Sequence, residues 1–247
     1  MVCVILAAGK NVRLDNGVPK SLLRVNHHSL LERHIRLFHK VGINQFCIVV
    51  GYRGDMIEDF ASELRAKYDV QIDFIQNVHY ELENGYSLLA AKDWIHDNNA
   101  EEFFFTMADH YYDLSFLEAA RNKRNFVNGE FLKLAVDKPG EHNDHIDIDD
   151  VTKVRVEGTI KNIGKQIENY NFYDTGLFFV KTRIYDYFHE VKPPQKCSIS
   201  ALVQQLGDEG KAATMDLTGH FWADIDTPQD LANTKILIEK IHTAPYT

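Results

Sequence analysis

Short apolar runs alternate with amphipathic segments over the first half of the chain. Residues 1–7 (MVCVILA) are apolar without interruption, which is typical of a strand buried on both faces of a sheet. Ser29 precedes an amphipathic stretch that stops at Gly42, so we expect a helix there with Ser29 as its N-cap. Further strands are expected at 45–50, 70–75 and 102–107, and further helices at 55–67 and 87–95. This alternation predicts a three-layer α/β fold with a mostly parallel, Rossmann-like sheet.

The pattern changes after about residue 125, where short strands with turn signals become more frequent. Strands are expected at 131–136, 152–156, 159–163, 173–180, 212–217 and 221–225, and helices at 185–191, 198–206 and 227–241. This half therefore predicts a mixed or antiparallel extension of the sheet. No repeat or low-complexity linker separates the two parts, so we expect a single domain over 1–247, with halves at 1–124 and 125–247.

Composition limits the kinds of ligand and the cellular location that we expect for the protein. The formal charge of −9 disfavours binding to a nucleic-acid backbone, although a local cluster of Lys and Arg can still bind a small anion. The cysteines at 3, 47 and 197 are widely spaced, which predicts buried apolar side chains and a reducing cytoplasm. No apolar run approaches the roughly 18 residues of a membrane span, and the first strand begins at once, so neither an anchor nor a signal peptide is expected.

The loop after the first strand is the first candidate site. It reads LAAGKNVRL from Leu6 to Leu14 and continues as PKSLL from Pro19 to Leu23. Ligands of open α/β sheets bind at the carboxyl ends of strands, and small residues let the backbone approach a phosphate. Arg13 and Lys20 add fixed positive charge. The residues alone leave two interpretations open, a polyphosphate cradle and a solvated surface loop.

Three carboxylates form the second candidate site. Asp109 ends an apolar strand, where it serves no packing purpose. Asp224 and Asp226 lie two residues apart, so an extended backbone places them on the same side. Oxygen ligands from separate strands are what Mg²⁺ prefers. Asp226 has an alternative role as the N-cap of the last helix, with Pro228 in the first turn.

Together, L-A-A-G-x-x-x-R-L and P-K-x-L-L resemble the entry loop of the sugar-phosphate nucleotidyltransferase family. The resemblance implies that Arg13, Lys20, Asp109 and Asp226 are the catalytic residues, of which Arg13 and Lys20 contact phosphates. It also implies that Asp109 and Asp226 hold Mg²⁺, with Asp224 as a further candidate ligand. The segment that would meet the nucleotide consists of Leu6, Ala7, Ala8, Gly9, Lys10 and Asn11. Asn11 and Val12 depart from the family pattern, which has Gly and Ser or Thr there.

The resemblance also assigns residues to the base and to the acceptor. Asn84, Gly85 and Ser87 match a turn that contacts the nucleobase, although Ser87 can instead cap a helix. The acceptor candidates are His110, Lys165, Asp174, Thr175 and Gly176. Lys165 would bind the acceptor's phosphate, and its alternative is a solvated lysine. Zinc binding by His142 and His145 is disfavoured, because they lie only three residues apart in an acidic loop without cysteine partners.

One branch of the family matches over most of the chain. The motifs N-G-Y-S-L-L-x-A-K, T-M-x-D-H, T-K-V-R-V, I-G-K, D-T-G and W-x-D-I-D-T resemble inositol-1-phosphate cytidylyltransferases. This implies transfer of CMP from CTP to a phosphorylated alcohol, with a separate membrane transferase using the product. The first half of the chain would bind the nucleotide and the second the acceptor. Alternatives are another acceptor (phosphocholine, a phosphonate or a sugar phosphate), a metal-dependent glycosyltransferase, and a non-catalytic nucleotide-binding regulatory module.

Overall fold

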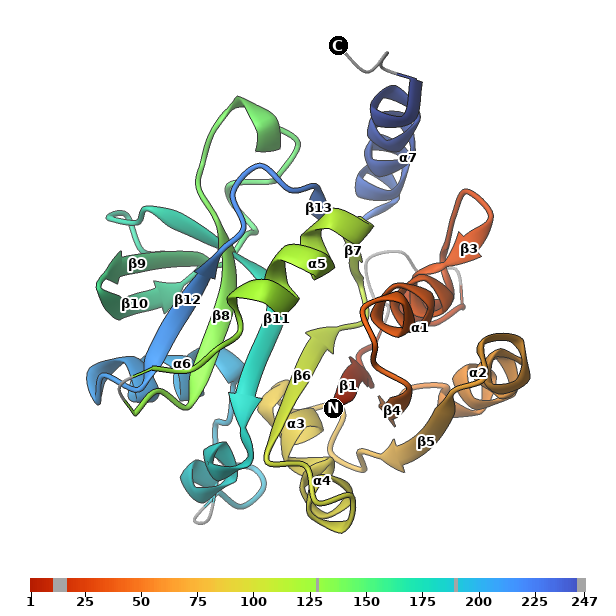
Figure 1. Cartoon of the computed structure of the whole chain (residues 1–247), viewed down its shortest axis with the longest axis horizontal. Helices are drawn as coiled ribbons and strands as arrows, with labels where there is room; N and C mark the ends of the chain where they lie inside the picture. Colours follow the sequence, from red (N-terminus) through yellow and green to blue (C-terminus); the bar gives the residue numbers. More distant parts are fainter. Residues whose placement is uncertain (11–16, 128, 189–190, 244–247) are drawn as a thin grey trace.

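Parallel strands from the first half of the chain form one side of the main sheet (Figure 1). The computed structural model describes residues 1–10, 17–127, 129–188 and 191–243. Strands β1 (Val2–Ala7), β4 (Gln45–Val50), β5 (Gln71–Gln76) and β6 (Glu102–Met107) run parallel, in the order β6-β1-β4-β5. β1 lies between β4 and β6, which explains why its sequence is apolar throughout. The predicted parallel α/β sheet is confirmed.

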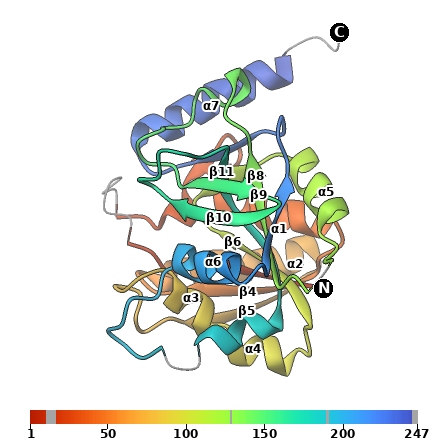
Figure 2. The same cartoon turned by 90° about the vertical axis from the view of Figure 1, so that its left-hand side faces the viewer.

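Helices cover both faces of this sheet, so that the fold has three layers. Along β1, Cys3 and Ile5 point into one buried cluster, whereas Val4 and Leu6 point into another. The first cluster includes residues of α1 (Leu30–Lys40), α2 (Gly54–Tyr68) and α5 (Leu114–Lys123). The second includes residues of α3 (Gly85–Ala90), α4 (Lys92–Asp97), α6 (Ile199–Asp208) and the 3₁₀ helix η3 (Thr182–Phe188). Figure 2 shows α3 and α6 on one side of the strands and α1, α2 and α5 on the other.

The second half of the chain continues the sheet with mixed strand directions, as predicted. β11 (Phe172–Lys181) pairs antiparallel with β6, with β8 (Leu132–Asp137) and with β9 (Lys153–Glu157). β10 (Thr159–Gly164) lies beyond β9, and β12 (Ala212–Asp216) runs parallel to β8. The register between β8 and β11 shifts between Asp174 and Phe178, where Gly176 has a φ of +72°. This irregularity lies beside the candidate site.

Several short elements surround the carboxyl end of β6. β7 (His110–Tyr112) follows it almost directly and pairs antiparallel with β13 (Trp222–Asp224), so that His110 lies opposite Asp224. α7 (Pro228–Thr243) comes next and lies at the periphery (Figures 1 and 2). The hairpin β2 (Arg24–Val25) and β3 (His28–Ser29) leads into α1. Two short 3₁₀ helices complete the set, η1 (Lys20–Leu22) and η2 (Glu141–Asn143).

The structure confirms some local predictions and corrects others. Ser29 caps α1, because its hydroxyl accepts a hydrogen bond from the backbone N–H of Glu32 at 3.1 Å. The helix expected at 87–95 is two helices, α3 and α4, and the one expected at 185–191 is the 3₁₀ helix η3. The three cysteines are buried and free, as expected. Within the described ranges, every helix is too short or too polar to cross a bilayer.

Candidate active site

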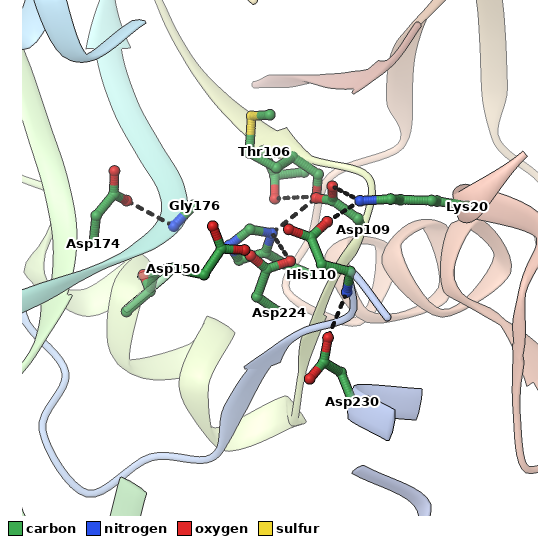
Figure 3. Close-up of polar contacts among 12 residues, drawn as sticks. Lys20, Thr106, Asp109, His110, Asp150, Asp174, Gly176, Asp224 and Asp230 are labelled. Atoms are coloured by element: carbon green, nitrogen blue, oxygen red, sulfur yellow. Dashed lines mark hydrogen bonds and ion pairs between the residues drawn. The ribbon is translucent and has the colours of Figure 1, made fainter. Parts of the chain in front are cut away.

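The candidate site forms where β6 ends and β7 meets β13. Asp109 lies between β6 and β7, and its Oδ1 lies 3.0 Å from Nδ1 of His110. Asp224, at the end of β13, brings its Oδ1 to 3.8 Å from the same nitrogen. Figure 3 shows these three side chains pointing toward one another, with Asp150 beside them. The antiparallel pairing of β7 with β13 therefore brings together Asp109 and Asp224, which are 115 positions apart in the sequence.

Lys20 reaches this carboxylate group from the opposite side (Figure 3). Its Nζ lies 3.5 Å from Oδ2 of Asp109 and also contacts Oδ1 of Asp226. The side chain of Lys20 is only 17% exposed, so its positive charge is largely removed from water and acts on these two carboxylates. The structure thus brings together Lys20, Asp109 and Asp226, the three described members of the predicted catalytic set. Arg13 and the neighbouring Asn11 lie outside the described residues.

Asp226 does not cap the last helix, so that alternative is wrong. The cap of α7 is made by Thr227 and Asp230: the Thr227 hydroxyl accepts from the backbone N–H of Asp230 at 3.2 Å. In return, Oδ2 of Asp230 accepts from the backbone N–H groups of Asp226 and Thr227, at 3.1 and 2.7 Å. This reciprocal arrangement fixes the backbone at Asp226 and leaves its carboxylate directed to Lys20.

The buried charges shift one another's pKa values. Burial acts to raise the pKa of Asp109, but the hydrogen bond and charge of His110, together with Lys20, hold it below its ordinary value. Burial acts to lower the pKa of His110, but Asp224 and Asp109 raise it to about 9, so this side chain is a cation at neutral pH. Burial also raises the pKa of Asp224 and brings that of Asp174 to about 6.

The donor set fits a divalent cation. Carboxylate oxygens of Asp109 and Asp224 lie within 4.8 Å of each other and of the His110 ring, which as a cation offers no lone pair to a metal. Oδ1 of Asp224 is buried and has no hydrogen-bond partner among the described residues. A buried carboxylate oxygen without a partner is costly unless a cation or a donor meets it. Carboxylate oxygens are also the ligands that Mg²⁺ prefers.

A first cavity, of about 140 Å³, adjoins Asp109 on the side of β1. Its wall combines the β1 loop with the start of α3: Leu6, Ala7, Ala8, Gly9, Lys10, Lys20, Ser21, Tyr80, Leu82, Asn84, Ser87, Met107, Ala108 and Asp109. Of the predicted nucleotide-binding residues that the structure describes, all but Gly85 line it. Gly85 instead packs on Cys197, since its N–H donates to the Cys197 carbonyl at 2.9 Å.

Two polar residues of this wall are held by protein contacts. Ser87 lies inside α3 and does not cap it; its hydroxyl accepts from Nδ2 of Asn77 at 3.0 Å. Oδ1 of Asn84 accepts from the backbone N–H of Ile199 at 2.9 Å and so ties α3 to the start of α6. The capping interpretation of Ser87 is therefore wrong, and Asn84 has a structural contact that the sequence did not suggest.

A second cavity, of about 150 Å³, adjoins Asp109 on the side of β11. It is lined by Asn84, Met107, Asp109, His110, Asp150, Val151, Thr152, Lys165, Asp174, Gly176, Phe178, Ile199, Ser200, Trp222 and Asp224. Four of the five predicted acceptor residues are in this wall. The fifth, Thr175, is buried behind it, where its hydroxyl donates to the carbonyl of Ala135 at 2.8 Å. Lys165 is not simply solvated, because its ammonium pairs with Asp150.

Gly176 is required where it stands. A Cβ at this position would lie 2.6 Å from the His110 ring, and the backbone φ of +72° also favours glycine. The carboxylate of Asp174 accepts from the N–H of Gly176 at 2.8 Å, which fixes the turn (Figure 3). The D-T-G motif therefore holds Asp174 and His110 in the same wall.

Sequence reasoning missed several residues of this wall, chiefly Asp150, Thr152, Ser200 and Trp222. Trp222 begins the W-x-D-I-D-T motif, and that position was the available signal. The two histidines considered for zinc have separate contacts: His142 with Asp137, and His145 with the carbonyl of Trp222.

The chain is similar to known proteins over nearly all of its length. A "bifunctional IPC transferase and DIPP synthase" of Aquifex aeolicus is 35% identical over 241 residues, which is 96% of this chain and 51% of the relative. A protein of the same description from Archaeoglobus fulgidus is 32% identical, with coverage of 94% and 42%. The chain spans about half the length of these curated relatives.

A solved structure and a family model agree with this result. The structure described as the inositol-1-phosphate CTP transferase from T. maritima superposes with a TM-score of 0.81 at 28% identity, covering 98% of this chain and 96% of that one. The model of the MobA-like NTP transferase domain matches residues 3–132 of the 247. The predicted resemblance to nucleotidyltransferases is thus confirmed, and the chain belongs to the family of the MobA-like NTP transferase domain.

Proposed function

We propose that this chain transfers a cytidylyl group from CTP to inositol 1-phosphate and releases pyrophosphate. The observation that carries the proposal is the arrangement of the two cavities, which share Asn84, Met107 and Asp109 in their walls. One has the glycine-containing loop and lysine that suit a triphosphate, and the other has the polar wall that suits a polyol phosphate. The names of the similar proteins support the choice of CTP and inositol 1-phosphate.

The reaction needs no protein nucleophile. An oxygen of the acceptor phosphate forms a bond to the α-phosphorus of CTP, and the bond from that phosphorus to the bridging oxygen of pyrophosphate breaks. Because the attacking oxygen is already anionic, the protein's work is positioning and charge stabilisation. Lys20 would contact the triphosphate, whereas Lys165 and the protonated His110 would meet the acceptor phosphate.

Asp109 and Asp226 would hold Mg²⁺ together with Asp224. The ion would neutralise charge on the α-phosphate during transfer. Asp174 is half-buried in the wall beside Gly176 and would accept hydrogen bonds from acceptor hydroxyls. In this scheme residues 1–124 supply the nucleotide site and residues 125–247 most of the acceptor wall. The reaction would take place in the cytoplasm, and a separate membrane transferase would consume the CDP-alcohol.

The test is a panel of CTP, ATP, GTP and UTP against inositol 1-phosphate, phosphocholine, a phosphonate and a sugar phosphate, with Mg²⁺. Pyrophosphate release and the CDP-alcohol product are both measured. We expect turnover with CTP and inositol 1-phosphate above all other pairs. Binding of CTP without pyrophosphate release for any acceptor would contradict the proposal, and so would a preference for a nucleotide sugar as donor.

Two variants test the assigned residues. Lys20→Ala and Asp226→Asn should each lower kcat/KM by roughly 100-fold or more, because each removes charge that acts on the phosphates. Lys161→Ala, on the exposed part of β10, is the matched control for the loss of a lysine. Full activity of Lys20→Ala would remove that residue from the scheme.

A further inference from the structure

A buried aspartate lies behind the acceptor cavity without lining it. Asp137 ends β8 and is fully buried. One carboxylate oxygen accepts from Nε1 of Trp222 at 2.9 Å and from Nδ2 of Asn143 at 2.7 Å. The other lies 2.8 Å from Nε2 of His142. A carboxylate is costly to bury even when it is paired, so its place in this core calls for a specific role.

Trp222 connects Asp137 to the cavity. Its indole is 1% exposed, lines the cavity wall and stacks on the His110 imidazole, with ring centroids 6.1 Å apart and planes 8° from parallel. The indole N–H is the polar group that Asp137 holds. On another side of the imidazole, the backbone of Gly176 approaches so closely that a Cβ would not fit. The orientation of His110 is therefore set partly by an indole whose own orientation is set by Asp137.

The same carboxylate also organises the turn that leads to the cavity rim. Asn143, which donates to Asp137, accepts from the N–H of Gly140 at 2.9 Å and donates to the carbonyl of Lys138. This turn continues to Asp150 and Thr152, which line the cavity. Asp137 thus contacts both structures that shape this side of the acceptor wall, the indole and the turn.

We propose that Asp137 is a positioning residue for the acceptor, which aligns Trp222 against His110 and fixes the turn at residues 138–146. The proposal deepens the proposed function and rests on it. Asp137 does not touch the substrate. Its loss should therefore weaken binding of the phosphorylated alcohol and leave CTP binding unchanged, because the nucleotide cavity has none of these contacts in its wall.

The chain contains a matched control for this hydrogen bond. Its other tryptophan, Trp94, donates through Nε1 to Asp73 at 3.0 Å, in a pair outside both cavity walls. Asp137→Ala should raise the KM for inositol 1-phosphate about tenfold, the effect of a lost hydrogen bond to a charged group. Asp73→Ala should leave that KM unchanged. In both variants the KM for CTP should stay at the wild-type value.

Asp137→Asn is a variant in which the side chain keeps its shape and its hydrogen-bond contacts while losing its charge. Its amide oxygen can still accept from Trp222 and Asn143 while its amide nitrogen faces His142, so its acceptor KM should stay within about threefold of wild type. Asp137→Ala combined with Trp222→Phe should lose less than the sum of the two single variants, since both remove the hydrogen bond between Asp137 and Trp222. A parallel rise in the KM for CTP, or equal losses in the Asp137 and Asp73 variants, would overturn the proposal.

A measurement without turnover separates this proposal from the proposed function. In Trp94→Phe, Trp222 is the only tryptophan, and its emission reports its contact with the His110 ring. Adding Asp137→Ala should change that emission and weaken the response to inositol 1-phosphate about tenfold. Unchanged emission and an unchanged titration would refute the positioning role even if cytidylyl transfer is observed. Absence of transfer in wild type, with the expected emission changes, would instead count against the proposed function alone.

Discussion

The carboxylate of Asp174 should strengthen binding of the acceptor and lower the free energy of unfolding of the protein. Its carboxylate lies in the acceptor wall, and burial raises its pKa from 3.8 to about 6, although the N–H of Gly176 and the charge of His110 oppose this shift. At neutral pH the group is therefore ionised in a place that disfavours its charge. Asp174→Asn keeps an oxygen for the Gly176 N–H and removes the charge. We expect this variant to be more stable than wild type and poorer at binding the acceptor.

The magnitude follows from the two pKa values. A rise from 3.8 to about 6 corresponds to about 3 kcal/mol, and solvent screening of a half-buried group reduces this to about 1–3 kcal/mol. Between pH 3.8 and 6 the native state holds a proton that the unfolded chain has released. Stability contributed by this group therefore falls as pH rises through that window, and the full cost applies above about pH 6.

Urea unfolding of wild type and Asp174→Asn at pH 4 and pH 7.5 measures the effect. The variant should be more stable by about 1–3 kcal/mol at pH 7.5, and the difference should vanish near pH 4. Asp59→Asn, on an exposed position of α2, controls for the loss of one negative charge from a chain of net charge −9. A gain that is equal at both pH values, or equal in the control, would refute the reasoning. Below pH 6 the KM for inositol 1-phosphate should rise more steeply in wild type than in the variant, where only the acceptor phosphate takes up a proton near this pH.

Other perturbations test the geometry of the site. Gly176→Ala should cost about 1–3 kcal/mol in urea unfolding and raise the acceptor KM, because its Cβ would collide with His110; wild-type stability would contradict the close approach. Asp230→Ala should lower the free energy of unfolding by about 1 kcal/mol and also lower kcat, because it frees the backbone that carries Asp226. A loss of stability with normal kcat would show that the helix cap does not position Asp226 for catalysis. Chelation of Mg²⁺ should abolish pyrophosphate release. It should leave the thermal midpoint of the nucleotide-free protein unchanged, since Lys20 pairs with Asp109 and Asp226, and His110 with Asp109 and Asp224, without a metal; a lower midpoint would assign the metal a structural role.

The sequence predicted those parts of the fold in which buried positions produce a recognisable pattern of apolar residues. β1 is apolar along its length, β6 contains three consecutive phenylalanines, and both lie inside the sheet, so both were located within a residue. β7 has three residues, too few to show alternation, and its pairing with β13 depends on a contact across more than 100 positions. The helix α5 was missed although its signal was present, since Asp113 caps it by accepting from the N–H of Phe116 at 2.8 Å.

Candidate site residues were predictable where a strand end or a motif marked them, as with Asp109 and the D-T-G turn. Residues in the acceptor wall that come from loops outside any motif, such as Asp150 and Val151, were not. Their side chains carry no periodic signal, and their positions depend on the turn after β8 that Asp137 holds. A buried aspartate in an apolar strand is visible in the sequence, but its partners are not.

The contact between Lys20 and Asp226 shows most clearly that the positions of residues in a sequence do not reveal which of them meet in the folded chain. The family resemblance assigned the lysine to phosphate and the aspartate to metal, as separate roles at positions 206 apart. In the folded chain they contact each other, and Lys20 also lies near Asp109. The proposed metal ligands and the proposed phosphate ligand are therefore partners before any substrate binds. We expect binding of CTP with Mg²⁺ to exchange this ion pair for two others, lysine with phosphate and carboxylates with metal. The exchange conserves the charge pairing of each group, so a largely buried lysine can be stable in the free protein and still be available to the triphosphate.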